Sequence, residues 1–142
     1  MIRLQCKTQT YAWGKLGSDS IVGRIARKNQ PDLEESKDFE ETPFAEYWMG
    51  DHVNGPSMIH VTAESCGMLG EDGFVQANEG QIVGLSELLK VSGPKFLGSG
   101  YHEQYPHAGS GLAFLFKVLS VKTALSIQAH PDRATAERLH SE

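Results

Sequence analysis

The alternation of apolar and polar residues predicts a chain built mainly of short β-strands. Strand-like stretches occur at residues 2–13, 44–50 and 57–61. Within 44–50, successive side chains of a strand point to opposite faces. The alternation therefore predicts one face made by Phe44, Glu46 and Trp48, and an opposite face made by Ala45, Tyr47 and Met49.

Two consecutive strands are predicted near the end of the chain. Residues 112–121, LAFLFKVLSV, are apolar at nearly every position, which indicates a strand covered by protein on both faces. After a turn at 122–123, residues 125–132, LSIQAHPD, alternate again and predict a further strand. Turn residues and few helices between such strands favour a mainly β sandwich or barrel over an α/β fold.

Three short helices are also predicted. Ile21, Val22 and Ile25 share one face of a helix within 18–29, with Ser18 or Asp19 as the cap. The other two helices cover 85–93, capped by Ser86, and the last residues, starting at Pro131 with Asp132 in the first turn. The segments between elements are read as a solvated connection at 30–43, a loop or weak strand at 62–84, and a glycine-rich loop at 98–111.

The polar face of residues 125–132 raises the first question about chemistry. Ser126, Gln128 and His130 would point the same way, with neighbours about 6.6 Å apart along the strand. A histidine nitrogen and a glutamine carboxamide oxygen at that spacing can converge on one metal ion, which would need further ligands from elsewhere. A face that is solvated or hydrogen-bonded also fits the pattern, and the spacing alone favours it over a metal site.

Lys117 is the second unusual position, because lysine is rarely buried without a partner. It interrupts the apolar run at 112–121. Its side chain either extends along an edge to solvent or reaches the same pocket as Gln128 and His130 across an antiparallel strand pair.

Composition narrows the classes of protein. The chain has 142 residues, enough for one domain, and a net charge of −5 without a stripe of lysine and arginine, which argues against a nucleic-acid groove. A few cations could still hold a phosphorylated small molecule. No apolar run approaches the roughly 20 residues of a membrane span, and no signal peptide is evident. Cys6 and Cys66 are read as free thiols, so a cytoplasmic protein is expected.

The segment 114–132, FLFKVLSVKTALSIQAHPD, resembles a characteristic stretch of the type I phosphomannose isomerases. Further stretches resemble the same family in the same order: QTYAWGKLGSDSIVGRIA at 9–26, PFAEYWMGDHVNGPS at 43–57 and GLSELLKVSGPKFLG at 84–98. The resemblance implies a cupin-type β-sandwich, or jelly roll, with a few short helices. It also implies a zinc-dependent aldose–ketose isomerase that interconverts mannose 6-phosphate and fructose 6-phosphate through an enediol, in the service of GDP-mannose biosynthesis.

Residue by residue, the resemblance implies one zinc ion with Gln128 and His130 among its ligands. Lys117 and Ser126 match catalytic positions, and Trp13 and Glu46 match positions near the substrate pocket. The implied partner is a small sugar phosphate, with no nucleic acid and no membrane, and a monomer is expected.

The chain also departs from the family pattern. The glutamate ligand of an NHKPE motif, a later histidine ligand and a later arginine are not in this sequence, and Ala113 replaces a proline common before FLFK. Residues 1–142 are therefore expected to be the N-terminal part of a truncated cupin-type catalytic domain, inactive or nearly so alone. The alternative is a non-catalytic cupin fragment that binds a metal or a sugar phosphate. A reading frame that continues past Glu142 into an NHKPE-like sequence would separate the two.

Overall fold

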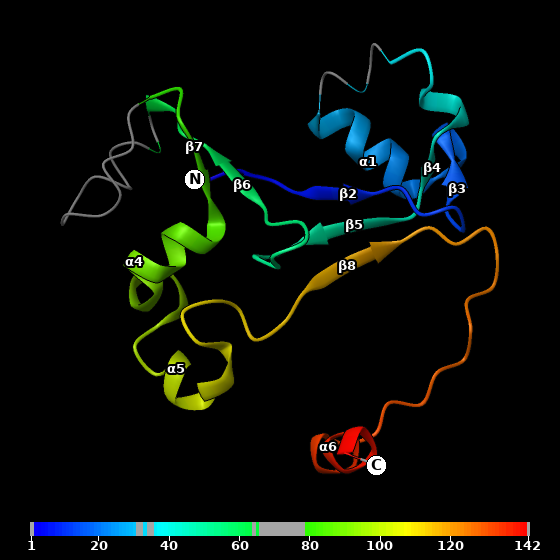
Figure 1. Cartoon of the computed structure of the whole chain (residues 1–142). Helices are drawn as coiled ribbons and strands as arrows, with labels where there is room; N and C mark the ends of the chain where they lie inside the picture. Colours follow the sequence, from blue (N-terminus) through cyan, green and yellow to red (C-terminus); the bar gives the residue numbers. More distant parts are fainter. Residues whose placement is uncertain (1, 31–32, 34–35, 64, 66–78, 142) are drawn as a thin grey trace.

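The computed structural model describes residues 2–30, 33, 36–63, 65 and 79–141 (Figure 1). Cys66 lies outside the described residues, whereas Cys6 is a buried free thiol. The strands are β1 (Leu4–Gln5), β2 (Lys7–Gln9), β3 (Lys15–Leu16), β4 (Pro43–Phe44), β5 (Glu46–Met49), β6 (Met58–His60), β7 (Ile82–Gly84) and β8 (Phe116–Leu119). The helices are α1 (Ile21–Asn29), α4 (Leu85–Leu97), α5 (Tyr101–Gln104) and α6 (Arg133–Ser141), with 3₁₀ turns η1 (Gly17–Asp19), η2 (Phe39–Glu41) and η3 (Pro106–Ala108).

The strands form three small antiparallel sheets. The first sheet has the order β2-β5-β8, with β5 in the centre; a second has the order β1-β6-β7, and β3 pairs with β4. In the first sheet Thr8, Tyr47 and Val118 lie side by side across the three strands. Short strands carrying the core, with α1 and α4 packed against them, confirm the predicted sheet architecture.

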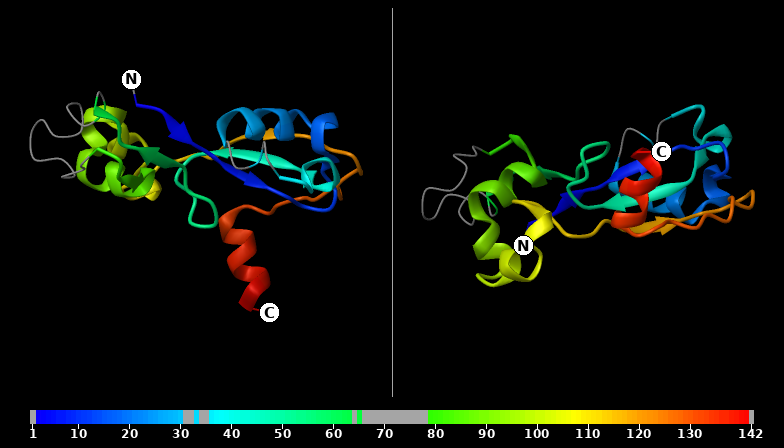
Figure 2. Two further views of the ribbon diagram at one scale, coloured as in Figure 1. Left: turned by 90° about the horizontal axis from the view of Figure 1, so that it is seen from above. Right: turned by 60° about the horizontal axis from the view of Figure 1, so that its bottom comes forward.

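Two apolar clusters stabilise these sheets. Helix α1 lies over one face of β2-β5-β8, as Figures 1 and 2 both show. The cluster beneath it consists of Cys6, Val22, Phe39, Phe44 and Tyr47. The other cluster joins β6 and β7 to α4 and consists of Ile59, Val61, Val83, Leu85, Leu88 and Leu89. The first cluster fixes which face of β5 is left for other contacts.

Helix α1 starts later than the sequence predicted. Its cap is Ser20, whose buried hydroxyl accepts from the Gly23 N–H at 3.1 Å and donates to the Phe44 carbonyl at 2.7 Å. The prediction of Ser18 or Asp19 as the cap was wrong. Ser18 instead donates to the Glu40 carboxylate through its N–H (3.0 Å) and its hydroxyl (2.6 Å), and these hydrogen bonds lower the pKa of Glu40.

Other predicted boundaries also need correction. Helix α4 is capped by Gly84, whose N–H donates to Glu87, and not by Ser86; it also runs past residue 93 to Leu97. The predicted loop at 98–111 contains α5 and η3. The predicted solvated connection at 30–43 buries Phe39 in the core, because η2 turns its ring against Phe44.

The end of the chain differs most from prediction. Residues 122–132 are all described and none of them lies in a strand, so the strand predicted at 125–132 is wrong. The alternation is present, but no described strand pairs with this segment, and an unpaired strand is not stable in water. The prediction that 112–121 is covered on both faces is also wrong, because β8 is an edge strand and Phe114 and Phe116 are each 59% exposed.

The last helix begins two residues after Pro131. Asp132 is its cap, since one carboxylate oxygen accepts from the Thr135 N–H at 2.8 Å. This hydrogen bond lowers the pKa of Asp132. Pro131 therefore precedes the cap and does not occupy the first helical position.

Substitution of Gly23 tests how closely α1 packs on the loop before it. Alanine usually favours a helix over glycine by about 1 kcal/mol, but a Cβ at this position would lie 2.3 Å from the Gly17 carbonyl oxygen and 2.9 Å from the Phe44 ring. We expect Gly23→Ala to lower the free energy of unfolding by about 1–3 kcal/mol in urea denaturation, as overpacking does.

The matched control for this substitution is Gly100→Ala. A Cβ at Gly100 would meet no atom within 4 Å, and its φ of −86° suits any residue. Its effect should stay within about 0.5 kcal/mol. A Gly23→Ala chain as stable as the control would contradict the observed packing of α1.

Candidate functional site

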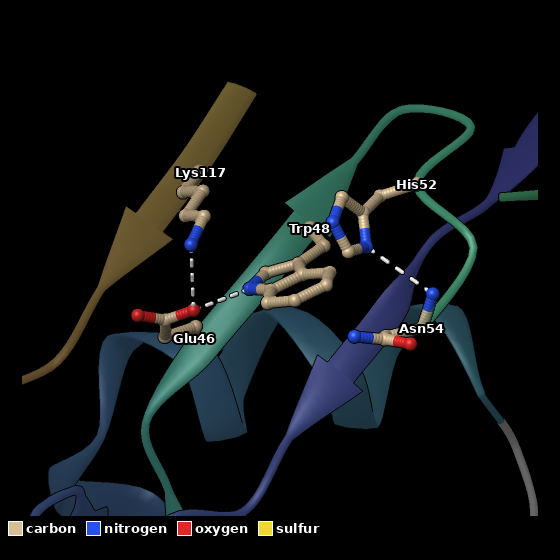
Figure 3. A network of polar contacts seen from close by, with 5 residues as sticks. All are labelled: Glu46, Trp48, His52, Asn54 and Lys117. Atoms are coloured by element: carbon tan, nitrogen blue, oxygen red, sulfur yellow. Dashed lines mark hydrogen bonds and ion pairs between the residues drawn. The ribbon is translucent and has the colours of Figure 1, made fainter. Parts of the chain in front are cut away.

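The face of β5 opposite α1 carries a polar group of side chains. Tyr47 points into the cluster beneath α1, so Glu46 and Trp48 point to the other side of the sheet. Lys117 on β8 lies directly across from Trp48 in the antiparallel register. Figure 3 shows Glu46, Trp48 and Lys117 gathered on this face. The alternation predicted for 44–50 is thus confirmed for Glu46, Tyr47 and Trp48. It is wrong for Phe44, which was predicted on the face of Glu46 but packs with Tyr47 in the cluster beneath α1.

Glu46, Trp48 and Lys117 form one connected network. Nζ of Lys117 lies 3.2 Å from Oε2 of Glu46, and the same oxygen accepts a hydrogen bond from the indole N–H of Trp48. The ammonium group also lies 4.5 Å from the centroid of the Trp48 ring, within the range of a cation–π interaction. Each member therefore contacts both of the others.

Burial makes this network energetically demanding. Glu46 is only 8% exposed, and a carboxylate in that environment is stable in its charged form only with hydrogen bonds or a counter-charge. Lys117 supplies the charge and Trp48 supplies a second donor. The Lys117 side chain remains 34% exposed, so its ammonium group can also reach a ligand on the open face. Figure 3 shows the second oxygen of Glu46 directed away from Trp48.

His52 extends the network, and the sequence did not indicate it. Its ring meets the Trp48 ring edge-on, with centroids 5.1 Å apart and an interplanar angle of 83°. Nδ1 of His52 accepts from the Asn54 N–H at 3.2 Å, in the turn that follows β5 (Figure 3). His52 matches no metal-ligand spacing, and only its position after Trp48 and before the Asn-Gly turn could have pointed to it.

Trp13 contacts Tyr11 and the segment that follows β8. Its ring stacks on Tyr11 with centroids 5.8 Å apart, and its carbonyl accepts from the N–H groups of Lys122 (2.9 Å) and Thr123 (3.3 Å). Trp13 therefore anchors the start of the segment that carries Ser126. Its predicted place near a substrate pocket stays a prediction.

Ser126, Gln128 and His130 are all exposed and lie in the irregular segment before α6. Gln128 donates to the Ser126 hydroxyl at 3.1 Å, so these two side chains do meet. The predicted antiparallel pair that would bring Lys117 to Gln128 and His130 is not formed, because β8 pairs with β5. Of the two positions predicted for Lys117, the structure shows the edge position: β8 is an edge strand, and the partly exposed Lys117 side chain pairs with Glu46.

The donors for a metal ion are suitable in type but not in number. Gln128 and His130 offer an oxygen and a nitrogen, whereas a zinc site in a protein uses three or four protein ligands. Within the part of the chain that the structure describes, no three histidine, cysteine, aspartate or glutamate side chains cluster as a metal site would require. These residues alone therefore do not make a complete metal centre.

The network has clear chemical capacities. An ammonium group has three donors, so Lys117 can bind Glu46 and still donate to an oxyanion or a hydroxyl on the open face. On the opposite face, burial raises the pKa of the Tyr47 hydroxyl. The arrangement is suited to holding a small polar or anionic ligand against one face of the sheet.

Comparison with known proteins defines the class. The family described as "Phosphomannose isomerase type I, catalytic domain" matches residues 1–142. Mannose-6-phosphate isomerase 2 of Arabidopsis thaliana is 40% identical over 145 residues, which cover 99% of this chain and 28% of that protein. The mannose-6-phosphate isomerase of Saccharomyces cerevisiae is 35% identical over 142 residues, which cover 100% of this chain and 28% of that protein.

A solved structure agrees with these relatives. A histidine-to-glutamine variant of phosphomannose isomerase from Salmonella typhimurium superposes with a TM-score of 0.62 at 27% identity, covering 99% of this chain and 28% of that one. The fold and the relatives therefore define part of a cupin-type catalytic domain. The chain belongs to the type I phosphomannose isomerase family. It spans about 28% of the length of the relatives that it matches.

Two ion pairs of this chain allow a direct test of the network. Double-mutant cycles would compare Glu46–Lys117 (Glu46→Gln, Lys117→Met) with Arg133–Glu137, a pair at 2.8 Å whose side chains are 91% and 66% exposed. We expect a coupling energy of about 1–3 kcal/mol for the first pair, because removing one partner leaves the other partly buried and unpaired. The exposed pair should give no more than about 0.5 kcal/mol.

The measurement is urea denaturation of each single and double variant. A coupling energy for Glu46–Lys117 no larger than that of the exposed pair would show that the network is not formed in solution.

Proposed function

We propose that this chain forms the N-terminal part of the catalytic domain of a mannose-6-phosphate isomerase, with mannose 6-phosphate and fructose 6-phosphate as its substrates. Family membership and the names of its relatives support this reaction. The observation that carries the proposal is the Glu46–Trp48–Lys117 network on the open face of β2-β5-β8. The cytoplasmic location, the monomeric state and a role in GDP-mannose biosynthesis belong to the same proposal.

The reaction sets three chemical requirements. An aldose–ketose isomerisation moves a proton between C2 and C1 through an enediol, so it needs a base, a positive group near the developing oxyanion and an anchor for the phosphate. In this proposal Lys117 supplies positive charge to the substrate, Glu46 holds the ammonium group in place, and Ser126 donates a hydrogen bond. Trp13 borders the substrate pocket.

The proposal includes zinc with Gln128 and His130 as two of its ligands. Their donor atoms are of a type that zinc accepts, and both side chains are exposed. A bound zinc would supply Lewis-acid polarisation of the substrate carbonyl. The further ligands implied by the family resemblance are not in this sequence, so the chain contributes only part of the metal centre.

Sugar-phosphate binding tests the proposed function. We expect isothermal titration calorimetry to detect mannose 6-phosphate binding to the chain, and Lys117→Gln to weaken it about tenfold, as loss of one charge-assisted hydrogen bond would. Lys90→Gln removes an exposed lysine of α4 and is the matched control. No binding by the unmodified chain, or equal loss in both variants, would contradict the proposal.

Turnover should be very low in the same chain. A coupled assay for fructose 6-phosphate should stay far below the roughly 1–10³ s⁻¹ of ordinary enzymes, because part of the proposed site is missing. Turnover within that range would show that these residues suffice.

Zinc binding tests the proposed ligands. We expect Gln128→Ala and His130→Ala each to weaken zinc binding in a competition assay with a chromophoric chelator, with the larger loss for His130 because imidazole is the better zinc ligand. His107→Ala is the matched control, since it removes an exposed histidine from η3. Unchanged affinity in both ligand variants would exclude these residues as ligands.

A further inference from the structure

A cavity with several polar lining residues lies apart from the Glu46–Trp48–Lys117 network. It has a volume of about 420 Å³, within the range of small-molecule sites. Its walls come from β1, the C-terminal end of α1, β6 and the residues next to them. None of its described lining residues belongs to β5 or β8; the polar ones are Arg3, Gln5, Lys28, Asn29, His60 and Thr62.

The charge of this cavity stands out in an acidic protein. The chain carries a net charge of −5, yet Arg3, Lys28 and the ionisable His60 line one cavity, and none of its described lining residues is acidic. The C-terminal end of a helix contributes about half a negative charge. Arg3 and Lys28 together outweigh that contribution, so the cavity favours anions.

Arg3 and His60 are held by neutral partners. Arg3 donates to the Asn29 side-chain oxygen at 3.0 Å, and the Asn29 amide is in turn fixed by donating to the Ile25 carbonyl at 2.9 Å. Nε2 of His60 donates to the side-chain oxygen of Gln5. A guanidinium bound to an amide oxygen keeps its full charge for a ligand, whereas one paired with a carboxylate does not. The two contacts orient Arg3 and His60. Neither contact neutralises the charge of Arg3, because Asn29 is uncharged.

We infer that this cavity binds a small phosphate-bearing molecule, a phosphate ester or a polyphosphate. Arginine presents parallel N–H donors that match two oxygens of one phosphate group, and lysine adds a point charge. One ring nitrogen of His60 is used on Gln5. The volume leaves room for more than a single phosphate.

The test uses inorganic pyrophosphate and the whole 142-residue chain, by isothermal titration calorimetry in buffer without divalent metal. The unmodified chain should bind it, and Arg3→Glu and Lys28→Glu should each weaken binding by at least about tenfold. Lys90→Glu makes the same change in net charge on exposed α4 and should alter the affinity less than about twofold.

Each other outcome overturns the inference. Equal losses in Lys28→Glu and Lys90→Glu would mean that only net charge matters. If circular dichroism shows that Arg3→Glu unfolds the chain, Arg3→Gln replaces it in the test, because glutamine keeps a hydrogen-bonding side chain. Unaltered binding in folded Arg3→Gln and Lys28→Glu chains would show that the cavity is not the site.

Discussion

The central position of β5 in the sheet β2-β5-β8 is the constraint on which the rest of the structure depends. Because side chains alternate along a strand, β5 turns Tyr47 toward α1 and Glu46 and Trp48 toward the open face. A shift of one residue in register would bury the carboxylate under α1 and expose the tyrosine. The apolar cluster beneath α1 therefore determines where the polar site lies, although it contributes no polar group to it.

On the polar side of β5, each buried polar group is stabilised by its contacts with the other two. A buried carboxylate, a lysine and an indole N–H are each costly to remove from water alone. Here one carboxylate oxygen accepts from both donors, and the indole ring lies beneath the ammonium group. Three groups that restrain one another are already oriented before a ligand arrives, which lowers the entropy cost of binding. The same reasoning applies to Arg3 and His60, which are oriented by Asn29 and Gln5.

The sequence predicted local features well where a local rule decides them. The alternation in 44–50 placed Glu46 and Trp48 on one face, and the spacing of Val22 and Ile25 predicted α1. Prediction from the sequence failed where a distant partner decides the structure. Residues 125–132 alternate like a strand but have no partner among the described strands. Phe114 and Phe116 were predicted to be covered but are exposed, at and beside an edge strand. Cap choice failed for a similar reason, since Ser18 is engaged by the distant Glu40. The family emerged from motifs, whereas the roles of Gln128, His130, Ser126 and Trp13 stay predictions.

The Glu46–Lys117 pair also has a consequence for the order of folding. The two residues are 71 positions apart in sequence, and the cost of closing a loop rises with its length. Strand β2 reaches β5 over a shorter span that already contains α1, so we expect β2, α1 and β5 to associate before β8. Until β8 arrives, Glu46 has Trp48 as a donor but no counter-charge. The docking of this edge strand then brings the counter-charge to the carboxylate. The same step completes the sheet and closes the longer of its two connections, the one between β5 and β8.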